Sequence, residues 1–148
     1  MNAIILSIGN ELLSGKTVNS NASYIGRKLY EIGIVVSEIQ TIADDAAAIR
    51  NSLGRGLAQF DLVFITGGRG PTHDDITKKV VAEYFNAENT AWTATCLRMD
   101  NEGASEVIMP GVPAEMKAIM REHILPFLRE KSGSVPLEVR QYRTTSIP

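Results

Sequence analysis

Residues 66–77 read Thr66-Gly67-Gly68-Arg69-Gly70-Pro71-Thr72-His73-Asp74-Asp75-Ile76-Thr77. An apolar run over 62–65 precedes this stretch, and apolar residues then recur at helical spacing from Ile76 to Phe85. We therefore expect a strand, a turn and a helix in that order. Three glycines within four residues allow positive φ angles, and the start of a helix offers unpaired N–H groups to an anion. The stretch predicts a phosphate-binding site.

The same stretch places two carboxylates, Asp74 and Asp75, where they would repel a phosphate that approached alone. A divalent cation removes this conflict, because Mg²⁺ binds through one or two carboxylates together with phosphate oxygens. The spacing of Thr72 and Asp75 is also that of a capping box, and acids in a first turn offset the helix dipole without any ligand. A cap explains Asp74, but a cap does not need three glycines, so the whole stretch favours a function.

Composition limits the class of protein. The chain has 148 residues and is interpreted as one domain over 1–148, with fifteen basic and seventeen acidic residues and a formal charge of -2. This balance argues against a nucleic-acid partner. Cys96 is the single cysteine, no apolar run approaches the ~20 residues that span a bilayer, and residues 3–8 lack the features of a signal peptide. We expect a cytoplasmic protein with no membrane association.

Apolar runs alternate with helical patterns along the chain. Strands are predicted over 3–8, 34–39, 62–65 and 106–109. Helices are predicted after the candidate caps Asn19, Ser20 and Asn21, after Asp44 or Asp45, from Ile76, and from Pro113 to a break or kink at Pro126. The segment 86–103 shows no clear period, and 137–147 is a candidate edge strand. The alternation predicts an α/β fold, a three-layer α/β/α sandwich with a mostly parallel sheet.

Four unusual loops follow the predicted strands directly. They contain Gly9-Asn10-Glu11, Asp44-Asp45, the stretch from Gly67 to Asp75, and Pro110-Gly111. Parallel α/β sheets bind ligands beyond the carboxyl ends of their strands, so these loops are expected to meet at one edge. The first loop is not a P-loop, because five residues separate Gly9 from Gly15 where that motif has four.

Three motifs resemble those of the molybdopterin-binding domain family, and within it the N-terminal domain of CinA-type competence/damage-inducible proteins. They are the segments at 9–21, at 67–77 and at 109–116, the last reading Met109-Pro110-Gly111-Val112-Pro113-Ala114-Glu115-Met116. Together they cover essentially the whole chain, and their order agrees with the family. The resemblance implies the family's α/β fold and a homo-oligomer, either a dimer or a trimer.

The resemblance implies two alternative chemistries. In the molybdenum-cofactor branch the domain binds molybdopterin and adenylylates it, with carboxylates that correspond to Asp44 and Asp75. In the CinA branch the resemblance implies metal-dependent hydrolysis of a pyrophosphate such as ADP-ribose. The sequence of residues 71–75 favours this second chemistry. A third alternative is a non-catalytic module that binds a pterin or a nucleotide.

The candidate site residues fall into three groups. The expected phosphate or cofactor contacts are Gly9, Asn10, Glu11, Gly67, Gly68, Arg69, Gly70, Thr72, Pro110 and Gly111. The expected catalytic residues are Asp75, Asp44 and His73, with His73 as general acid or metal ligand. The expected ligands of a divalent metal such as Mg²⁺ are Asp75, Asp44 and Glu11.

The sequence departs from the subfamily at three points. The segment between the central helix and Pro110 is several tens of residues shorter than the resemblance leads us to expect. Arg69 replaces a small or apolar residue, and Asn10 stands where relatives often carry Asp, which removes one carboxylate that could bind a metal. The C-terminal amidase domain of many CinA proteins is not part of this chain, so amidase activity is not implied.

Overall fold

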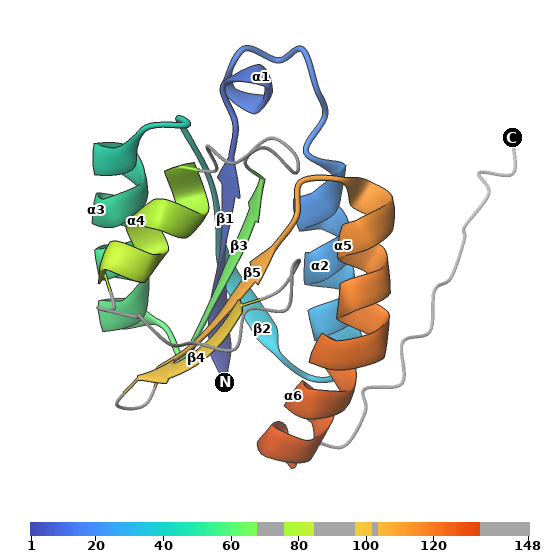
Figure 1. Ribbon diagram of the computed structural model, residues 1–148. Helices are drawn as coiled ribbons and strands as arrows, with labels where there is room; N and C mark the ends of the chain where they lie inside the picture. Colours follow the sequence, from blue (N-terminus) through green and yellow to red (C-terminus); the bar gives the residue numbers. More distant parts are fainter. Residues whose placement is uncertain (68–75, 85–96, 102–103, 134–148) are drawn as a thin grey trace, which may run out of the picture.

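The computed structural model describes residues 1–67, 76–84, 97–101 and 104–133, and its strands form one five-stranded sheet (Figure 1). The sheet order is β2-β1-β3-β5-β4. The strands are β1 (Asn2–Ile8), β2 (Val35–Ile42), β3 (Leu62–Gly67), β4 (Leu97–Asn101) and β5 (Ala104–Met109). Strands β2, β1, β3 and β5 pair in parallel, and β4 pairs antiparallel with β5. The predicted mostly parallel sheet is confirmed.

Helices cover both faces of this sheet. They are α1 (Asn10–Leu13), α2 (Ser20–Glu31), α3 (Ala46–Gln59), α4 (Ile76–Tyr84), α5 (Pro113–Ile119), the π-helical turn η1 (Met120–Ile124) and α6 (Leu125–Ser132). Helices α3 and α4 lie on one face, and α2, α5 and α6 lie on the other (Figure 1). The side chains of the central strands alternate between two apolar clusters, one under each helical layer. This is the predicted three-layer α/β/α sandwich.

The predicted helix ends around β2 are confirmed in detail. Asn19 caps α2, because its Oδ1 accepts a hydrogen bond from the Ala22 amide at 3.2 Å. Asp45, and not Asp44, caps α3 by accepting from the Ala48 amide at 3.0 Å. Gly33 has a φ of +79° just after α2, as expected for a residue that stops a helix. These caps set where α2 and α3 leave the edge of the sheet.

Strand β2 runs three residues farther than the sequence predicts. The predicted strand ends at Ile39, whereas the structure continues it to Ile42. The reason is pairing, since Thr41 lies opposite Ser7 and Ile42 lies opposite Ile8 in the register with β1. The extension brings the following Asp44 close to the loop after β1.

The closing helix also differs from the prediction, which placed a break or kink at Pro126. The helical segment continues to Ser132, and the five residues of η1 before α6 adopt a π-helical turn. Proline lacks the N–H of a regular helix and its ring meets the carbonyl four residues earlier, so a wider turn before Pro126 accommodates it. Strand β4 lies within the segment 86–103, in which the sequence showed no period, and the candidate strand 137–147 lies outside the described residues.

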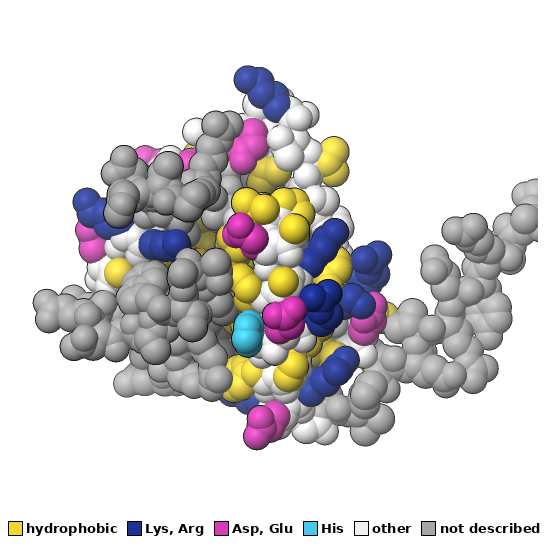
Figure 2. Space-filling view, turned by 45° about the vertical axis from the view of Figure 1, so that its right-hand side comes forward, with side chains coloured by type: hydrophobic (Ala, Val, Ile, Leu, Met, Phe, Trp, Pro, Cys, Tyr) yellow, Lys and Arg dark blue, Asp and Glu magenta, His cyan; other side chains and the backbone are white. Residues whose placement is uncertain are grey.

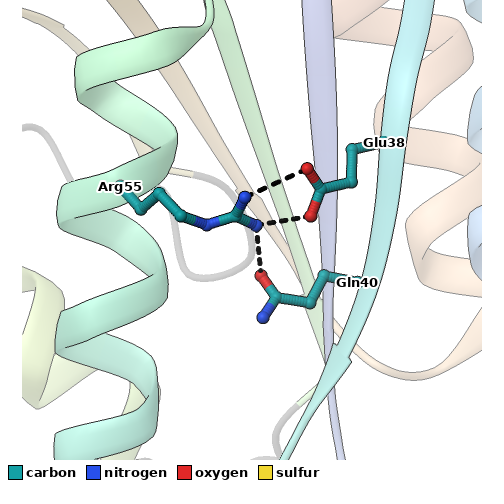
Figure 3. Close-up of polar contacts among 3 residues, drawn as sticks. All are labelled: Glu38, Gln40 and Arg55. Atoms are coloured by element: carbon teal, nitrogen blue, oxygen red, sulfur yellow. Dashed lines mark hydrogen bonds and ion pairs between the residues drawn. The ribbon is translucent and has the colours of Figure 1, made fainter.

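A polar contact ties α3 to the edge strand β2 (Figure 3). The Arg55 guanidinium donates to both carboxylate oxygens of Glu38, at 3.1 Å to Oε2, and also donates to Gln40 Oε1 at 3.0 Å. This bidentate bond is the main reason that the pKa of the Glu38 carboxyl lies below its ordinary value. The ionised form of Glu38 is therefore favoured in the folded protein.

We expect this pair to make folding stability depend on acidic pH. Because the pKa of Glu38 is lowered on folding, its contribution is present above the pKa of the unfolded chain and is lost as the pH falls through the folded value. Glu38→Gln should reduce the loss of stability measured by urea unfolding between about pH 7 and about pH 3. In an Arg55→Leu background, Glu38→Gln should change this slope no further. If Glu38→Gln still changes the pH dependence of stability in the Arg55→Leu background, that dependence comes from another partner of Glu38.

Candidate ligand-binding site

The chain reverses its direction of travel through the sheet between β1 and β3. It leaves β1 through α2 on one face to reach β2, and returns through α3 on the other face to reach β3. Strands β1 and β3 are neighbours, with Ile8 paired to Gly67 at their carboxyl ends. In open α/β sheets, ligands bind in the crevice outside such a switch point. The topology thus points to the edge that holds the predicted loops.

A cavity of about 460 Å³ lies at this switch point. Its walls come from the ends of β1 and β3, from the loop between α1 and α2 together with the start of α2, and from the loop between β5 and α5. The lining residues are Ile8, Glu11, Leu12, Thr17, Val18, Asn19, Ser20, Asn21, Thr66, Gly67, Gly111, Val112 and Pro113. A volume of this size falls in the range of small-molecule sites, and its mostly apolar walls with a few polar groups are typical of them.

Gly67 is the lining residue whose backbone most strictly requires glycine. Its φ is +110°, and a Cβ built on it would lie 2.0 Å from the carbonyl oxygen of Ile8. That oxygen belongs to the neighbouring strand β1, so it has no freedom to move aside without breaking the pairing of the two strands. The wall of the cavity is therefore bare backbone at this point, which permits close approach of a ligand.

A buried hydrogen-bond network joins three walls of the cavity. Asn21, in the first turn of α2, donates through Nδ2 to Thr66 Oγ1 at 3.0 Å and to the carbonyl oxygen of Gly111 at 3.0 Å. The Thr66 hydroxyl donates in turn to the carbonyl oxygen of Pro110 at 3.3 Å. These bonds connect α2, β3 and the loop after β5, so they fix the relative positions of Gly67 and Gly111.

The start of α2 faces the cavity with its positive dipole end. Asn19, Ser20 and Asn21 all line the cavity, and these residues form the cap and first turn of a twelve-residue helix. The Asn19 side chain is held by two donors, the Ala22 amide and the Ser7 hydroxyl, the latter at 3.3 Å. The N-terminal end of a helix favours an anion, because its first N–H groups point outward and its dipole is positive there.

Glu11 brings a carboxylate to the opposite wall. A Cβ added to Gly9 would lie 2.7 Å from Glu11 Oε1 and 2.9 Å from Oε2, so the carboxylate packs directly over the bare Cα of Gly9. Glu11 is half-buried and lines the cavity. The absence of a side chain at Gly9 therefore determines where the Glu11 carboxylate lies.

The loops after β1 and β2 are also joined. Asn10 Oδ1 accepts a hydrogen bond from the Asp44 amide at 3.3 Å. Asp44 thus lies beside the Asn10–Glu11 segment, although it is not among the residues that line the cavity. The extension of β2 to Ile42 is what brings the two loops together.

Of the three expected metal ligands, Glu11 and Asp44 belong to the described residues. Within 1–67, 76–84, 97–101 and 104–133, no three His, Cys, Asp or Glu side chains form a group that could hold a metal ion. Glu11 and Asp44 belong to two neighbouring loops, and the third expected ligand, Asp75, lies outside these residues. The described donors alone therefore do not make a metal site.

The predicted site residues divide into three sets. Glu11, Gly67 and Gly111 line the cavity. Gly9, Asn10, Asp44 and Pro110 adjoin it through the contacts given above. Gly68, Arg69, Gly70, Thr72, His73 and Asp75 lie outside the described residues.

Sequence reasoning missed the two side chains at the centre of the network, Asn21 and Thr66. The sequence indicates Asn21 as a candidate helix cap and as the end of the motif at 9–21, but not as a buried residue, whereas its side chain is 9% exposed. A signal was available, because Asn21 stands four residues before the buried Ile25 and so lies on the apolar stripe of α2. Thr66 gave a similar signal as a polar residue at the end of a buried strand.

The surface over α5 and α6 is distinct from this site. Hydrophobic side chains lie there between charged groups (Figure 2). His123, in η1, is exposed and does not line the cavity. Within the described part of the chain, no helix is long and apolar enough to cross a membrane.

Comparisons with known proteins agree with this architecture. The family model described as "Probable molybdopterin binding domain" matches residues 4–130. A CinA-like protein of Chloroherpeton thalassium is 37% identical over 89% of this chain, and one of Chlorobaculum tepidum is 38% identical over 90%. Both alignments cover 42% of the relative, so the chain spans less than half the length of these relatives.

Solved structures give the same result. A crystal structure of the protein CinA, of unknown function, from Thermoplasma acidophilum has a TM-score of 0.73 and 30% identity, covering 88% of this chain and 96% of that one. A molybdopterin biosynthesis enzyme, MoaB, from Thermus also has a TM-score of 0.73, with 17% identity and coverage of 88% and 92%. At that identity, the second likeness concerns the fold alone.

Proposed function

The chain belongs to the molybdopterin-binding domain family, and we propose that its cavity binds the phosphate group of a nucleotide or a pterin. The observation that carries this proposal is the cavity at the switch point, whose lining includes both the backbone of Gly67 and the first turn of α2. Oriented N–H groups and a close backbone approach are what a phosphate requires. Apolar residues such as Leu12 and Val112 offer a surface for the organic part of the ligand.

We further propose that the bound ligand is a pyrophosphate such as ADP-ribose and that the protein hydrolyses it with a divalent metal such as Mg²⁺. Glu11, Asp44 and Asp75 would hold the metal, which supplies charge neutralisation at the phosphate. Gly67 and the start of α2 bind and orient the diphosphate. In this proposal His73 is the general acid at the leaving phosphate oxygen.

The support for this hydrolysis is the position of Glu11. Its half-buried carboxylate shares the cavity with the proposed phosphate cradle, and Asp44 lies beside the same loop. Two carboxylates near a phosphate oppose its binding unless a cation lies between them. Adenylylation of molybdopterin remains the alternative chemistry of the same groups. A homo-oligomer in the cytoplasm is part of the proposal.

A non-catalytic binding module is the second candidate, and the length of the alignments favours it. The alignment with the Chloroherpeton relative runs over 176 positions, more than the 148 residues of this chain, yet it covers 89% of the chain. The relative therefore carries extra residues within the matched region. If the missing residues close the site over a substrate, this chain would bind ligand without turning it over.

One experiment separates these candidates. The purified protein is incubated with ADP-ribose and a panel of divalent metals, and AMP and ribose 5-phosphate are measured by chromatography. Metal-dependent release of both products supports hydrolysis, whereas calorimetric binding without turnover supports the binding module. Neither binding nor turnover would contradict the nucleotide proposal. Mass spectrometry of a co-purifying ligand then distinguishes a pterin from a nucleotide.

We expect Gly9→Ala to weaken the binding of Mg²⁺ without unfolding the protein. The new Cβ would occupy the place of the Glu11 carboxylate, which can swing aside because it is the end of a flexible side chain. The expected loss of stability is about 1 kcal/mol or less, while the Mg²⁺ concentration for half-maximal turnover should rise several-fold. Glu11→Gln is the matched variant and should raise the same concentration. A Gly9→Ala variant with unchanged Mg²⁺ dependence would remove Glu11 from the proposed ligand set.

A further inference from the structure

Asn21 has a hydrogen-bond acceptor that no described residue of the chain uses. The side chain is 9% exposed and lines the cavity, and both of its bonds are donated through Nδ2. Within the part of the chain that the structure describes, Asn21 Oδ1 is buried with no hydrogen-bond partner. Buried polar atoms in native proteins are almost always paired, so an unpaired acceptor on a residue that lines a cavity points to a donor that the described residues do not supply and that a ligand in the cavity can provide.

The orientation of the Asn21 amide is fixed by its neighbours. The carbonyl oxygen of Gly111 can only accept a hydrogen bond, so the atom of Asn21 that faces it must be the nitrogen. The Thr66 hydroxyl gives its proton to the carbonyl oxygen of Pro110 and therefore also accepts from Asn21. Exchanging the amide oxygen and nitrogen would break both contacts. The orientation that keeps both contacts leaves Oδ1 as the unpaired atom, and an amide oxygen needs a hydrogen-bond donor.

We propose that Asn21 is a specificity-determining residue whose Oδ1 accepts a hydrogen bond from an N–H or O–H group on the organic part of the ligand. The diphosphate oxygens of ADP-ribose are fully ionised at neutral pH and only accept hydrogen bonds, so they cannot satisfy Asn21 Oδ1. Two parts of the cavity would then bind two parts of the ligand. Gly67 and the start of α2 would bind the phosphate, and Asn21 would select for a hydroxyl or amino group beside it. The inference rests on the proposed function, because it concerns the same cavity.

Two probes separate the two tasks. ADP-ribose carries a diphosphate and many donor groups, whereas inorganic pyrophosphate carries the diphosphate without an organic part. Asn21→Leu has nearly the same shape and removes both the donor and the acceptor. We expect it to weaken ADP-ribose binding, measured by calorimetry, about tenfold or more and pyrophosphate binding less than about threefold. Equal weakening of both probes, or of neither, would overturn the inference.

Two further variants control for other causes. Asn51→Leu makes the same exchange at an exposed position of α3 and should leave the affinity for both probes unchanged. Asn21→Asp keeps the acceptor oxygens but loses the donors to Thr66 and Gly111, so it reports the structural role of the network. The new negative charge of Asn21→Asp should weaken the binding of both probes to a similar extent, so the ratio of the two affinities should be preserved. If the ratio of the affinities for ADP-ribose and pyrophosphate falls by the same factor in Asn21→Asp and Asn21→Leu, the effect comes from the hydrogen-bond network and the inference is contradicted.

A measurement on the unaltered protein covers the case in which Asn21→Leu does not fold. The side-chain amide ¹⁵N resonance of Asn21 responds to a hydrogen bond at its own carbonyl oxygen. We expect this resonance to shift on adding ADP-ribose and not on adding pyrophosphate. An unchanged resonance with saturating ADP-ribose would overturn the inference alone, whereas failure of both probes to bind would overturn the proposed function and the inference with it.

Discussion

Asp75→Asn is expected to reduce metal-dependent turnover of ADP-ribose by about a hundredfold or more. Asp75 lies outside the described residues, and the expectation comes from the sequence, which places it directly after the glycine-rich stretch and before Ile76. A carboxylate there opposes phosphate binding unless a metal bridges the two. Replacement by the neutral amide would remove the proposed metal ligand and also a like charge. Affinity for the anionic ligand without metal should therefore be retained or improved, as measured by calorimetry.

The control for this variant is Asp45→Asn. Asp45 caps α3 through the Ala48 amide, so it reports what the same exchange costs at a helix start that has no other task. Asn is also a good cap, and we expect a change in unfolding free energy below about 0.5 kcal/mol for both variants. If Asp75→Asn keeps full turnover, as Asp45→Asn should, Asp75 is only a cap and the main argument for a metal fails.

Gly67→Ala is expected to cost roughly 3–5 kcal/mol of unfolding free energy, which is enough to unfold many small domains. The added Cβ would lie 2.0 Å from the Ile8 carbonyl oxygen, and the φ of +110° is itself unfavourable for alanine. Relief requires β1 and β3 to separate at the edge that forms the cavity. Urea unfolding measures the loss.

Gly15→Ala is the matched control for Gly67→Ala. Gly15 also has a positive φ, +75°, but a Cβ there meets nothing within 4 Å. It should cost only about 1–2 kcal/mol, which is the cost of the left-handed conformation alone. Similar losses for the two variants would show that the contact with Ile8 does not determine the stability of this edge.

The sequence predicted the fold well because local signals and pairing agreed. The apolar runs marked the parallel strands, and Asn19, Asp45 and Gly33 marked helix ends that the structure confirms. The family indicated by the three motifs is confirmed by the match over residues 4–130. Periodicity did not predict two features, one set by strand pairing and one by the chemistry of proline. Strand β2 extends because β1 is beside it, and a π-helical turn carries the closing helix through Pro126.

The candidate site was only partly predictable. Glycines and acids after strands are visible in the sequence, so Glu11, Gly67 and Gly111 could be named before the cavity was known. The network of Asn21 and Thr66 joins segments separated by 45 and 90 residues, and only the folded chain brings them together. In the sequence Asn21 has the features of a helix cap, and only the folded structure shows that it lines the cavity.

The most direct measurement of the central claim is a map of amide chemical shifts on adding ADP-ribose with Mg²⁺ to the ¹⁵N-labelled protein. The account predicts that the largest shifts fall on Glu11, Asn21, Gly67 and Gly111, which surround the cavity at the switch point. Arg55 and Lys131, on helices α3 and α6 and outside the cavity lining, should shift little. Saturating ligand that shifts the amides of α3 or α6 and leaves Gly67 and Gly111 unchanged would contradict the account.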